Sequence, residues 1–168
     1  MGFIKLAHGD LDNAIKAIGS DWMLITVKDN KTGKVNAMTA SWGAMGVLWN
    51  KSICVCFVRP ERYSYELLCE NKELSIAFLP ETCRDAYKIC GRESGRDQDK
   101  IGKCGLNIID LDGIPCIAEA QTVLGCRVLY EDDLKEANFL DRSLLKNYEN
   151  GGYHRVYVCE IKEAYGRE

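Results

Sequence analysis

The strongest constraint on the fold is a series of strand-like segments separated by turn-forming residues. Residues 53–58, ICVCFV, form a continuous apolar run that Pro60 ends, which predicts a strand buried on both faces. Residues 29–33, DNKTG, have hairpin-turn chemistry, so their flanking segments should pair directly. The predicted strands cover residues 22–27, 34–38, 53–58, 74–79, 118–130, with a bulge at Gly125, and 153–163.

Helices are expected to be short and to lie between the strands. The predicted helices are 11–18, capped by Asp10 and ended by Gly19; 64–70, capped by Ser64; one that starts at a capping-box-like segment, 82–85, and reaches Cys90; and one that Asp97 caps before Gly105. Residues 39–50 show no periodicity, and residues 131–150 are polar and ambiguous.

This pattern predicts a mainly β protein, an antiparallel barrel with peripheral α-helices, rather than a doubly wound parallel sheet. The 168 residues fit one domain, 1–168, that can bury its own core. The sequence contains no linker, internal repeat or low-complexity segment.

Composition narrows the classes of function. Hydrophobic residues make up 46% of the chain and charged residues 28%, as in an ordinary globular protein. The formal net charge of -3 argues against nucleic-acid binding, which needs a basic surface. No apolar run reaches the roughly 18 residues of a membrane span, and residues 1–10 lack the features of a secretory signal. We therefore expect a cytoplasmic protein that binds neither nucleic acid nor membrane.

Nine cysteines are many for this length, yet no C-x-x-C pair occurs among them. Several lie in apolar runs, so we expect small buried side chains in a reducing compartment, with a metal or redox role as the alternative. The only histidines are His8 and His154, which excludes a histidine-rich metal centre, and we expect no metal. Neither a G-x-x-x-x-G-K-[ST] loop nor a G-x-G-x-x-G segment after a strand is present, so a Rossmann nicotinamide site is not expected.

Residues 36–43, NAMTASWG, form the first candidate binding segment. Small side chains alternate here with hydroxyl and amide groups. Such a backbone can approach a flat ring and offer N–H and hydroxyl groups to heteroatoms at the ring edge, which bury poorly when unpaired. The alternative interpretation is a tight turn rich in Ser and Thr.

Residues 59–65, RPERYSY, form the second candidate segment. Arg59 and Arg62 follow a buried strand, and a helix is expected to begin at Ser64. Guanidinium groups match phosphate geometry, and a helix N-terminus adds free N–H groups, so the segment can hold a phosphate. The alternative is a solvated basic turn in which Arg62 pairs with Glu61 or Glu66.

Residues 91–100, GRESGRDQDK, form the third candidate segment. Ser94 and Gly95 precede a predicted helix start, and Lys100 follows one turn later, so the segment can close over a phosphate from the other side. The alternative is a charged loop that faces solvent.

The fourth candidate segment is GGYHR, residues 151–155, where a glycine-containing loop enters the last predicted strand. His154 can face a redox centre and hydrogen-bond to a substrate. The alternative is a structural histidine at a strand start.

Taken in this order, the segments resemble the flavin-reductase-like family of FMN-binding split barrels, with flavoredoxins as the most similar subgroup. The matching residues are NAMTASW at 36–42, RPERYSY at 59–65, SGRDQDK at 94–100 and YHRVY at 153–157, and the resemblance spans roughly residues 20–163. It implies a six-stranded Greek-key split barrel that forms a homodimer, with FMN near the subunit interface.

The resemblance also implies roles for individual residues. The residues implied to line the isoalloxazine and ribityl chain are Asn36, Ala37, Met38, Thr39, Ala40, Ser41 and Trp42. Those implied to hold the phosphate are Arg59, Arg62, Tyr63 and Ser64, together with Ser94, Gly95 and Lys100 from the same or the partner subunit. His154 matches a histidine near the flavin and is the candidate catalytic residue.

The implied activity is hydride transfer from NADH or NADPH to flavin N5. Without a Rossmann motif, the nicotinamide would stack directly on the exposed flavin face, bordered by Trp42 or His154. The alternative is an electron carrier that retains FMN and exchanges electrons with a redox partner protein. A third interpretation is a relative that binds another planar cofactor such as haem, with His154 as an iron ligand.

Overall fold

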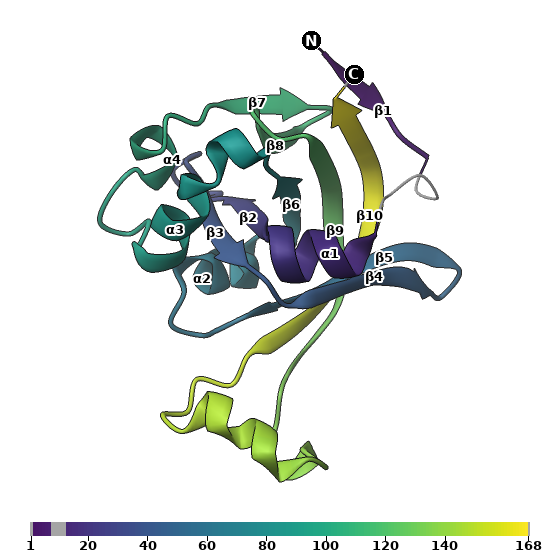
Figure 1. Cartoon of the computed structure of the whole chain (residues 1–168), viewed down its shortest axis with the longest axis vertical. Helices are drawn as coiled ribbons and strands as arrows, with labels where there is room; N and C mark the ends of the chain where they lie inside the picture. Colours follow the sequence, from purple (N-terminus) through teal and green to yellow (C-terminus); the bar gives the residue numbers. More distant parts are fainter. Residues whose placement is uncertain (1, 8–12, 168) are drawn as a thin grey trace.

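The fold is built around one curved antiparallel sheet of eight strands (Figure 1). The strands follow the order β3-β2-β6-β9-β10-β5-β4, and β1 pairs with β10. The structure, a computed structural model, describes residues 2–7 and 13–167. The strands of the sheet are β1 (Phe3–Lys5), β2 (Met23–Lys28), β3 (Val35–Ala40), β4 (Gly43–Leu48), β5 (Lys51–Val58), β6 (Glu73–Phe78), β9 (Thr122–Asp133) and β10 (Arg155–Arg167). A separate hairpin contains β7 (Ile108–Leu111) and β8 (Ile114–Ile117).

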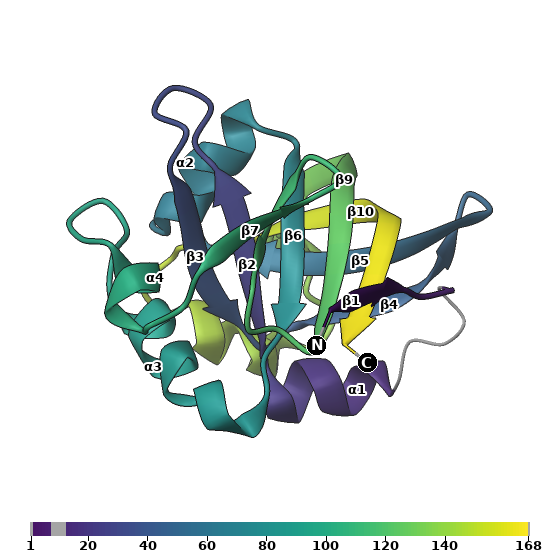
Figure 2. The same cartoon turned by 90° about the horizontal axis from the view of Figure 1, so that it is seen from above.

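Short helices lie around the sheet, with α3 and α4 beside β3 (Figure 2). The α-helices are α1 (Ala14–Lys16), α2 (Tyr63–Glu70), α3 (Asp85–Arg92) and α4 (Lys100–Lys103). A π-helical turn, Ala17–Asp21, extends α1, and 3-10 turns occupy Glu81–Cys83, Glu136–Asn138 and Arg142–Tyr148. None of the described helices is long and apolar enough to cross a membrane. The predicted antiparallel split barrel with peripheral helices is confirmed, with eight strands in the sheet where the resemblance implies six.

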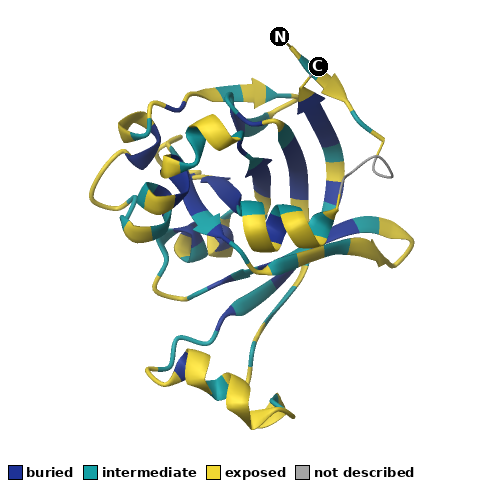
Figure 3. Ribbon diagram, viewed as in Figure 1, coloured by how far each residue is buried: buried dark blue, intermediate teal, exposed yellow. Residues whose placement is uncertain are grey.

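The centre of the sheet is buried on both faces (Figure 3). Alternate residues of β2 point in opposite directions, so Met23 and Ile25 join the larger apolar cluster, while Leu24 joins a second cluster with Tyr87 of α3. The larger cluster fills the barrel, and the second packs helices and the β7–β8 hairpin onto the outside of the sheet.

The predicted hairpin between β2 and β3 is confirmed. The Asp29 carboxylate accepts hydrogen bonds from the Lys31 N–H at 2.8 Å and from the Thr32 hydroxyl at 2.7 Å. Gly33 has a positive φ of 74°, which a residue without a side chain adopts readily. The turn fixes the register that pairs Val27 with Asn36 and so places the first candidate segment along β3.

The prediction that residues 39–50 are irregular is wrong for most of that range. Residues Gly43–Leu48 form β4, which pairs with β5 through a two-residue turn, Trp49 and Asn50, both with positive φ. The strand carries no apolar alternation because it lies at the sheet edge and is mostly exposed. Its regularity comes from β5, so its own side chains gave no signal.

The expectation that residues 53–58 are buried on both faces is only partly right. Cys54, Cys56 and Val58 on one face are buried, and so is Ile53 on the other, whereas Val55 and Phe57 on that second face are partly exposed. Both faces carry apolar side chains because the second face borders the cleft described below. The cysteines follow their expected pattern: all nine are free, and six of them are buried.

Helix starts are the least accurate predictions. The expected caps Asp10, Ser64 and Asp97 and the 82–85 capping box are replaced by other arrangements: Asn13 caps α1, Arg62 and Arg84 precede α2 and α3 without a side-chain cap, and Asp99 caps α4. Asp10 itself lies outside the described residues. The first helix continues past Gly19 to Asp21, and α3 reaches Cys90 as predicted and continues to Arg92. Local sequence offers several capping side chains within one turn, and tertiary contacts select among them.

The ladder between β9 and β10 is irregular near Gly125, as predicted, but the extra residue at that point, Lys162, belongs to β10. Residues 134–153, which connect these two strands, extend away from the barrel and carry two 3-10 turns (Figure 1). We call this segment the arm. It corresponds to the stretch that was ambiguous in the sequence, and it returns to the barrel at His154.

Candidate functional site

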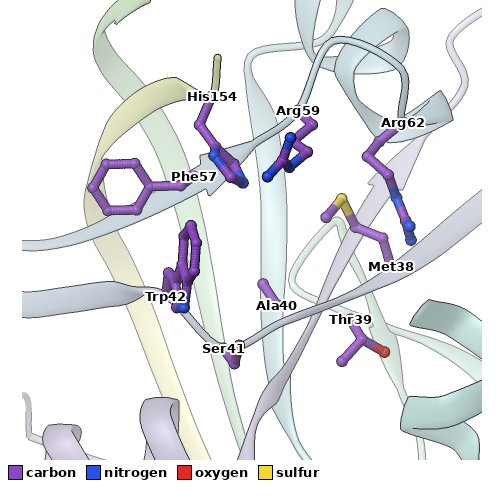
Figure 4. Close-up of a pocket in the computed structure, with 9 residues that line it drawn as sticks. All are labelled: Met38, Thr39, Ala40, Ser41, Trp42, Phe57, Arg59, Arg62 and His154. Atoms are coloured by element: carbon purple, nitrogen blue, oxygen red, sulfur yellow. The ribbon is translucent and has the colours of Figure 1, made fainter. Parts of the chain in front are cut away.

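A cleft of about 260 Å³ opens where β3, β4 and β5 meet the end of the arm (Figure 4). Its lining residues are Met38, Thr39, Ala40, Ser41, Trp42, Phe57, Arg59, Arg62 and His154. Ser41 and Trp42 lie between the last ladder pair of β3 and the first of β4, so their backbone groups are not used in the sheet. The sheet thus leaves a short stretch of free backbone along one wall of the cleft.

Three aromatic rings gather at one end of the cleft (Figure 4). The ring centroids of Trp42 and His154 are 5.1 Å apart, and those of Phe57 and His154 are 6.4 Å apart at an interplanar angle of 90°. Trp42 is 47% exposed, which is unusual for so large an apolar side chain. This end of the cleft therefore offers flat apolar surface to a ligand.

His154 is nearly buried, with 9% of its surface exposed. Its Nδ1 atom lies 2.9 Å from the hydroxyl of Tyr148 in the arm. Burial, reinforced by the nearby positive charge of Arg59, lowers the pKa of His154 to about 4. The ring is therefore neutral at pH 7.

Arg59 ties the arm to the barrel. It donates hydrogen bonds to the carbonyl of Asn147 at 2.8 Å and to that of Gly152 at 3.3 Å, and it lies 5.2 Å from the centroid of the Tyr148 ring. Arg59 also lines the cleft. Its role in holding a phosphate stays a prediction, and in this structure two of its amino groups bind the arm.

Arg62 connects α2 with α3. It donates to the carbonyl of Gly91 at 2.6 Å and to that of Cys90 at 3.0 Å. Burial lowers the pKa of its guanidinium. The alternative interpretation, in which Arg62 pairs with Glu61 or Glu66, is wrong for the described residues, because Arg62 turns toward the carboxyl end of α3 instead.

A second, larger cavity of about 880 Å³ contains further predicted residues: Asn36, Tyr63, Gly95 and Lys100. Asn36 lies two residues before Met38 on β3, on the same face, so the two cavities share one wall. A Cβ atom at Gly95 would lie only 1.9 Å from Oδ1 of Asn36. The third candidate segment therefore packs against the first within a single chain and needs glycine at this contact.

Lys100 is the most unusual charged group of the site, with only 4% of its surface exposed. Within the part of the chain that the structure describes, the only hydrogen bond of its amino group is a long one, 3.4 Å, to the carbonyl of Cys90. Among residues 2–7 and 13–167, no carboxylate lies within 4.0 Å of its amino group. Burial is the largest effect on the pKa of Lys100 and lowers it; Arg62 lowers it further, whereas Cys90 and the Glu93 carboxylate oppose the shift. A buried cation without a direct ion pair is costly unless an anion joins it.

Three predicted residues line neither cavity. Ala37 points to the opposite face of β3 and packs in the second apolar cluster. Ser64 is fully buried and accepts a hydrogen bond from Nδ2 of Asn36 at 2.8 Å. The Ser94 hydroxyl accepts a hydrogen bond from the Arg96 N–H. Their binding roles stay predictions, and in this structure Ser64 orients Asn36.

Sequence reasoning missed two residues of the site, Phe57 and Tyr148. Phe57 lies two positions before Arg59 and so on the same face of the chain, a spacing that could have identified it. Tyr148 had no local signal, because its contact with His154 depends on how the arm folds back.

The chain matches the family model described as flavin reductase like domain over residues 15–168. Among solved structures it is similar to the flavoredoxin of Methanosarcina acetivorans, with 24% identity, a TM-score of 0.69 and coverage of 88% of this chain and 69% of that one. An FMN-binding protein from Thermus thermophilus gives 20% identity, a TM-score of 0.68 and coverage of 97% and 81%. The NADH:FAD oxidoreductase of Streptomyces globisporus C-1027 gives 15% identity, a TM-score of 0.66 and coverage of 88% of this chain and 80% of that one. A search among curated protein sequences finds no match.

Fold and site together define a split barrel with a flat aromatic slot and a neighbouring cavity that contains a buried lysine. The family match covers nearly the whole chain, and the chain belongs to the flavin reductase-like domain family.

We predict that His154 stays neutral from pH 8 to pH 5 and titrates near pH 4. Because its folded pKa is below the unfolded value of about 6.5, the unfolded chain takes up the proton first. The stabilisation from the neutral ring is complete above pH 6.5 and is lost as the pH falls toward 4, by up to about 3 kcal/mol. Urea unfolding of the wild type and His154→Gln at pH 7 and pH 4.5 measures this difference. In the His8→Gln variant, where His154 is the single histidine, a histidine NMR signal titrating near pH 6.5 would contradict it.

Proposed function

We propose that the protein binds FMN in the cleft and acts as an NAD(P)H-dependent flavin reductase. The observation that carries the proposal is a cleft with a flat aromatic slot that shares a wall with a second cavity, where a buried lysine makes no direct ion pair. Membership of the flavin reductase-like domain family supports a flavin cofactor. The names of the flavoredoxin, the FMN-binding protein and the NADH:FAD oxidoreductase point to the same chemistry.

The residues present fit a flavin phosphate ester. Gly95 brings its backbone against Asn36 without a side chain between them. Lys100, with Arg62 nearby, supplies positive charge at the end of the site where Gly95 meets Asn36. This charge favours a phosphate. At the other end, Ser41 and Trp42 offer backbone N–H groups that the ladders leave free, suited to the polar edge of a ring.

When bound, the flavin supplies a hydride acceptor at N5. The chain contributes placement: Met38 and Ala40 form an apolar floor, and Trp42 and Phe57 exclude water at the open end. The positive charge of Lys100 and Arg62 would favour an anionic ligand over a neutral one. Without a Rossmann motif in the sequence, the nicotinamide would bind directly against the flavin at the aromatic end.

Lys100→Gln should weaken FMN binding by about 10- to 100-fold, the loss of one charge-assisted hydrogen bond of about 1.5–3 kcal/mol. Lys103→Gln is the matched control, because Lys103 lies on the same helix but is exposed and paired with Glu93. Fluorescence titration with FMN gives both dissociation constants. Equal affinities for the two variants would move the phosphate away from Lys100.

Anaerobic mixing of the FMN-loaded protein with NADH or NADPH tests the reductase activity. Bleaching of the flavin absorbance, followed by steady turnover of added free flavin, is the expected result. The similarity to flavoredoxins gives the alternative of an electron carrier with a redox partner protein. Flavin that remains bound through gel filtration and is reduced slowly by both nicotinamides would favour the carrier and contradict the reductase.

We also propose that the protein is a homodimer that pairs through the β4–β5 hairpin and α1. Val47 is 77% exposed, Trp49 56% and Ile15 86%, and β4 and α1 are in contact. Such a group of exposed apolar side chains marks an interaction surface, and Trp42 at the start of the hairpin would bring the cleft close to it.

Light scattering should give twice the mass of the chain, and Val47→Glu should halve the measured mass. Leu140→Glu, at a fully exposed position of the arm, is the control. A monomeric wild type at micromolar concentration would contradict the dimer.

A further inference from the structure

Tyr148 lies behind His154 and outside the cleft. Its side chain is 7% exposed, and the two rings are nearly perpendicular, with centroids 5.6 Å apart. The Tyr148 hydroxyl is 2.9 Å from Nδ1 of His154, while Tyr148 itself is not among the residues that line the cleft. Tyr148 can therefore act on a ligand only through its neighbours that line the cleft, His154 by a hydrogen bond and Arg59 by contact with its ring.

The hydrogen bond fixes the position of the imidazole proton. Within residues 2–7 and 13–167, the Tyr148 hydroxyl has no acceptor other than Nδ1. A phenol is a good donor, and an unprotonated imidazole nitrogen is a good acceptor, so the phenol donates to Nδ1. A neutral imidazole carries one proton, which is then on Nε2.

The surroundings hold Tyr148 in place. Its ring stacks on that of Tyr153 with centroids 4.7 Å apart at 11°, and Phe139 contacts it from a further side at 5.6 Å. Arg59 lies over the ring and donates to the carbonyl groups of Asn147 and Gly152 on either side of it in the chain. Arg59 and, more distantly, Glu61 are the charged groups that act on His154, and their effects oppose each other.

We propose that Tyr148 is a positioning residue that holds His154 as the Nε2–H tautomer, so that the aromatic end of the cleft recognises a ligand through a carbonyl oxygen. Figure 4 shows the His154 ring directed toward Trp42 and Arg59, at the cleft wall. An N–H at this position can donate to the carbonyl or carboxamide oxygen of a planar ligand held against Trp42. The ligand class rests on the proposed function, whereas the tautomer is a property of the chain alone.

The test uses the ligand-free protein and its histidine NMR signals. The chain has two histidines, so His8→Gln leaves His154 as the single source of signal. Long-range proton–nitrogen correlation at pH 7 should show Nε2 protonated and Nδ1 unprotonated. Tyr148→Phe should remove this preference and give averaged nitrogen shifts. Tyr153→Phe, which retains the stacking ring and removes a hydroxyl that does not contact His154, should leave the tautomer unchanged.

A kinetic measurement separates the positioning role from a structural one. In Tyr148→Phe, KM for NADH or NADPH should rise about fivefold, the loss of one neutral hydrogen bond, while the dissociation constant of FMN stays unchanged. A proton on Nδ1 in the wild type, or an unchanged tautomer in Tyr148→Phe, would overturn the assignment. A fixed Nε2–H tautomer in a chain that binds no FMN would support the role of Tyr148 and overturn the proposed function instead.

Discussion

The site depends on two arginines that follow β5 and bind backbone carbonyl groups. Arg62 reaches the carboxyl end of α3, and Arg59 reaches both sides of the last turn of the arm. Neither α3 nor the arm is part of the main sheet, so hydrogen bonds of the ladder cannot place them. Apolar packing and the hydrogen bonds of Tyr87 hold α3 against the sheet. The charge-assisted bonds of the two arginines fix the carboxyl end of α3 and the last turn of the arm, and a guanidinium can make two of them at once with fixed geometry. The segment that follows β5 thus positions two walls of the cleft, while Phe57 of β5 itself also lines the cleft.

This arrangement concentrates positive charge without neutralising it. Arg62 and Lys100 both donate a hydrogen bond to the carbonyl of Cys90. Burial is the main cause that lowers the pKa of each side chain. Carbonyl oxygens satisfy the donors only in part and leave the net charge in place. The chain as a whole is acidic, with a formal net charge of -3, so the buried Lys100 and the half-buried Arg62 differ from the general surface. A dianionic phosphate would relieve the cost of keeping two like charges close together, which ties the fold of α3 and α4 to ligand binding.

The sequence predicts those parts of the structure that depend on local chemistry. The β2–β3 hairpin follows from Asp29 and Gly33. The four candidate segments could be found because each is a continuous stretch of the chain with its own local chemistry. Strand β4 could not be predicted, because its backbone is ordered by β5 while its own side chains face solvent. The dipeptide Asp112–Gly113 is typical of a two-residue hairpin turn, and both residues have a positive φ in the β7–β8 hairpin. This hairpin could therefore have been predicted, although the predicted strands do not include it. Tyr148 lay beyond prediction for a different reason, since its partner is chosen by the path of the whole arm.

Charge is divided unevenly between the two cavities, and this division constrains what each of them can do. The second cavity contains the buried Lys100, whereas in the cleft burial and the charge of Arg59 keep His154 uncharged at pH 7. A neutral histidine is a weak acid, but its ring N–H can still orient a polar ligand. The arginine that holds the arm adds to the effect of burial and disfavours protonation of the ring. A change at Arg59 would therefore alter both the position of the arm and the pKa of His154.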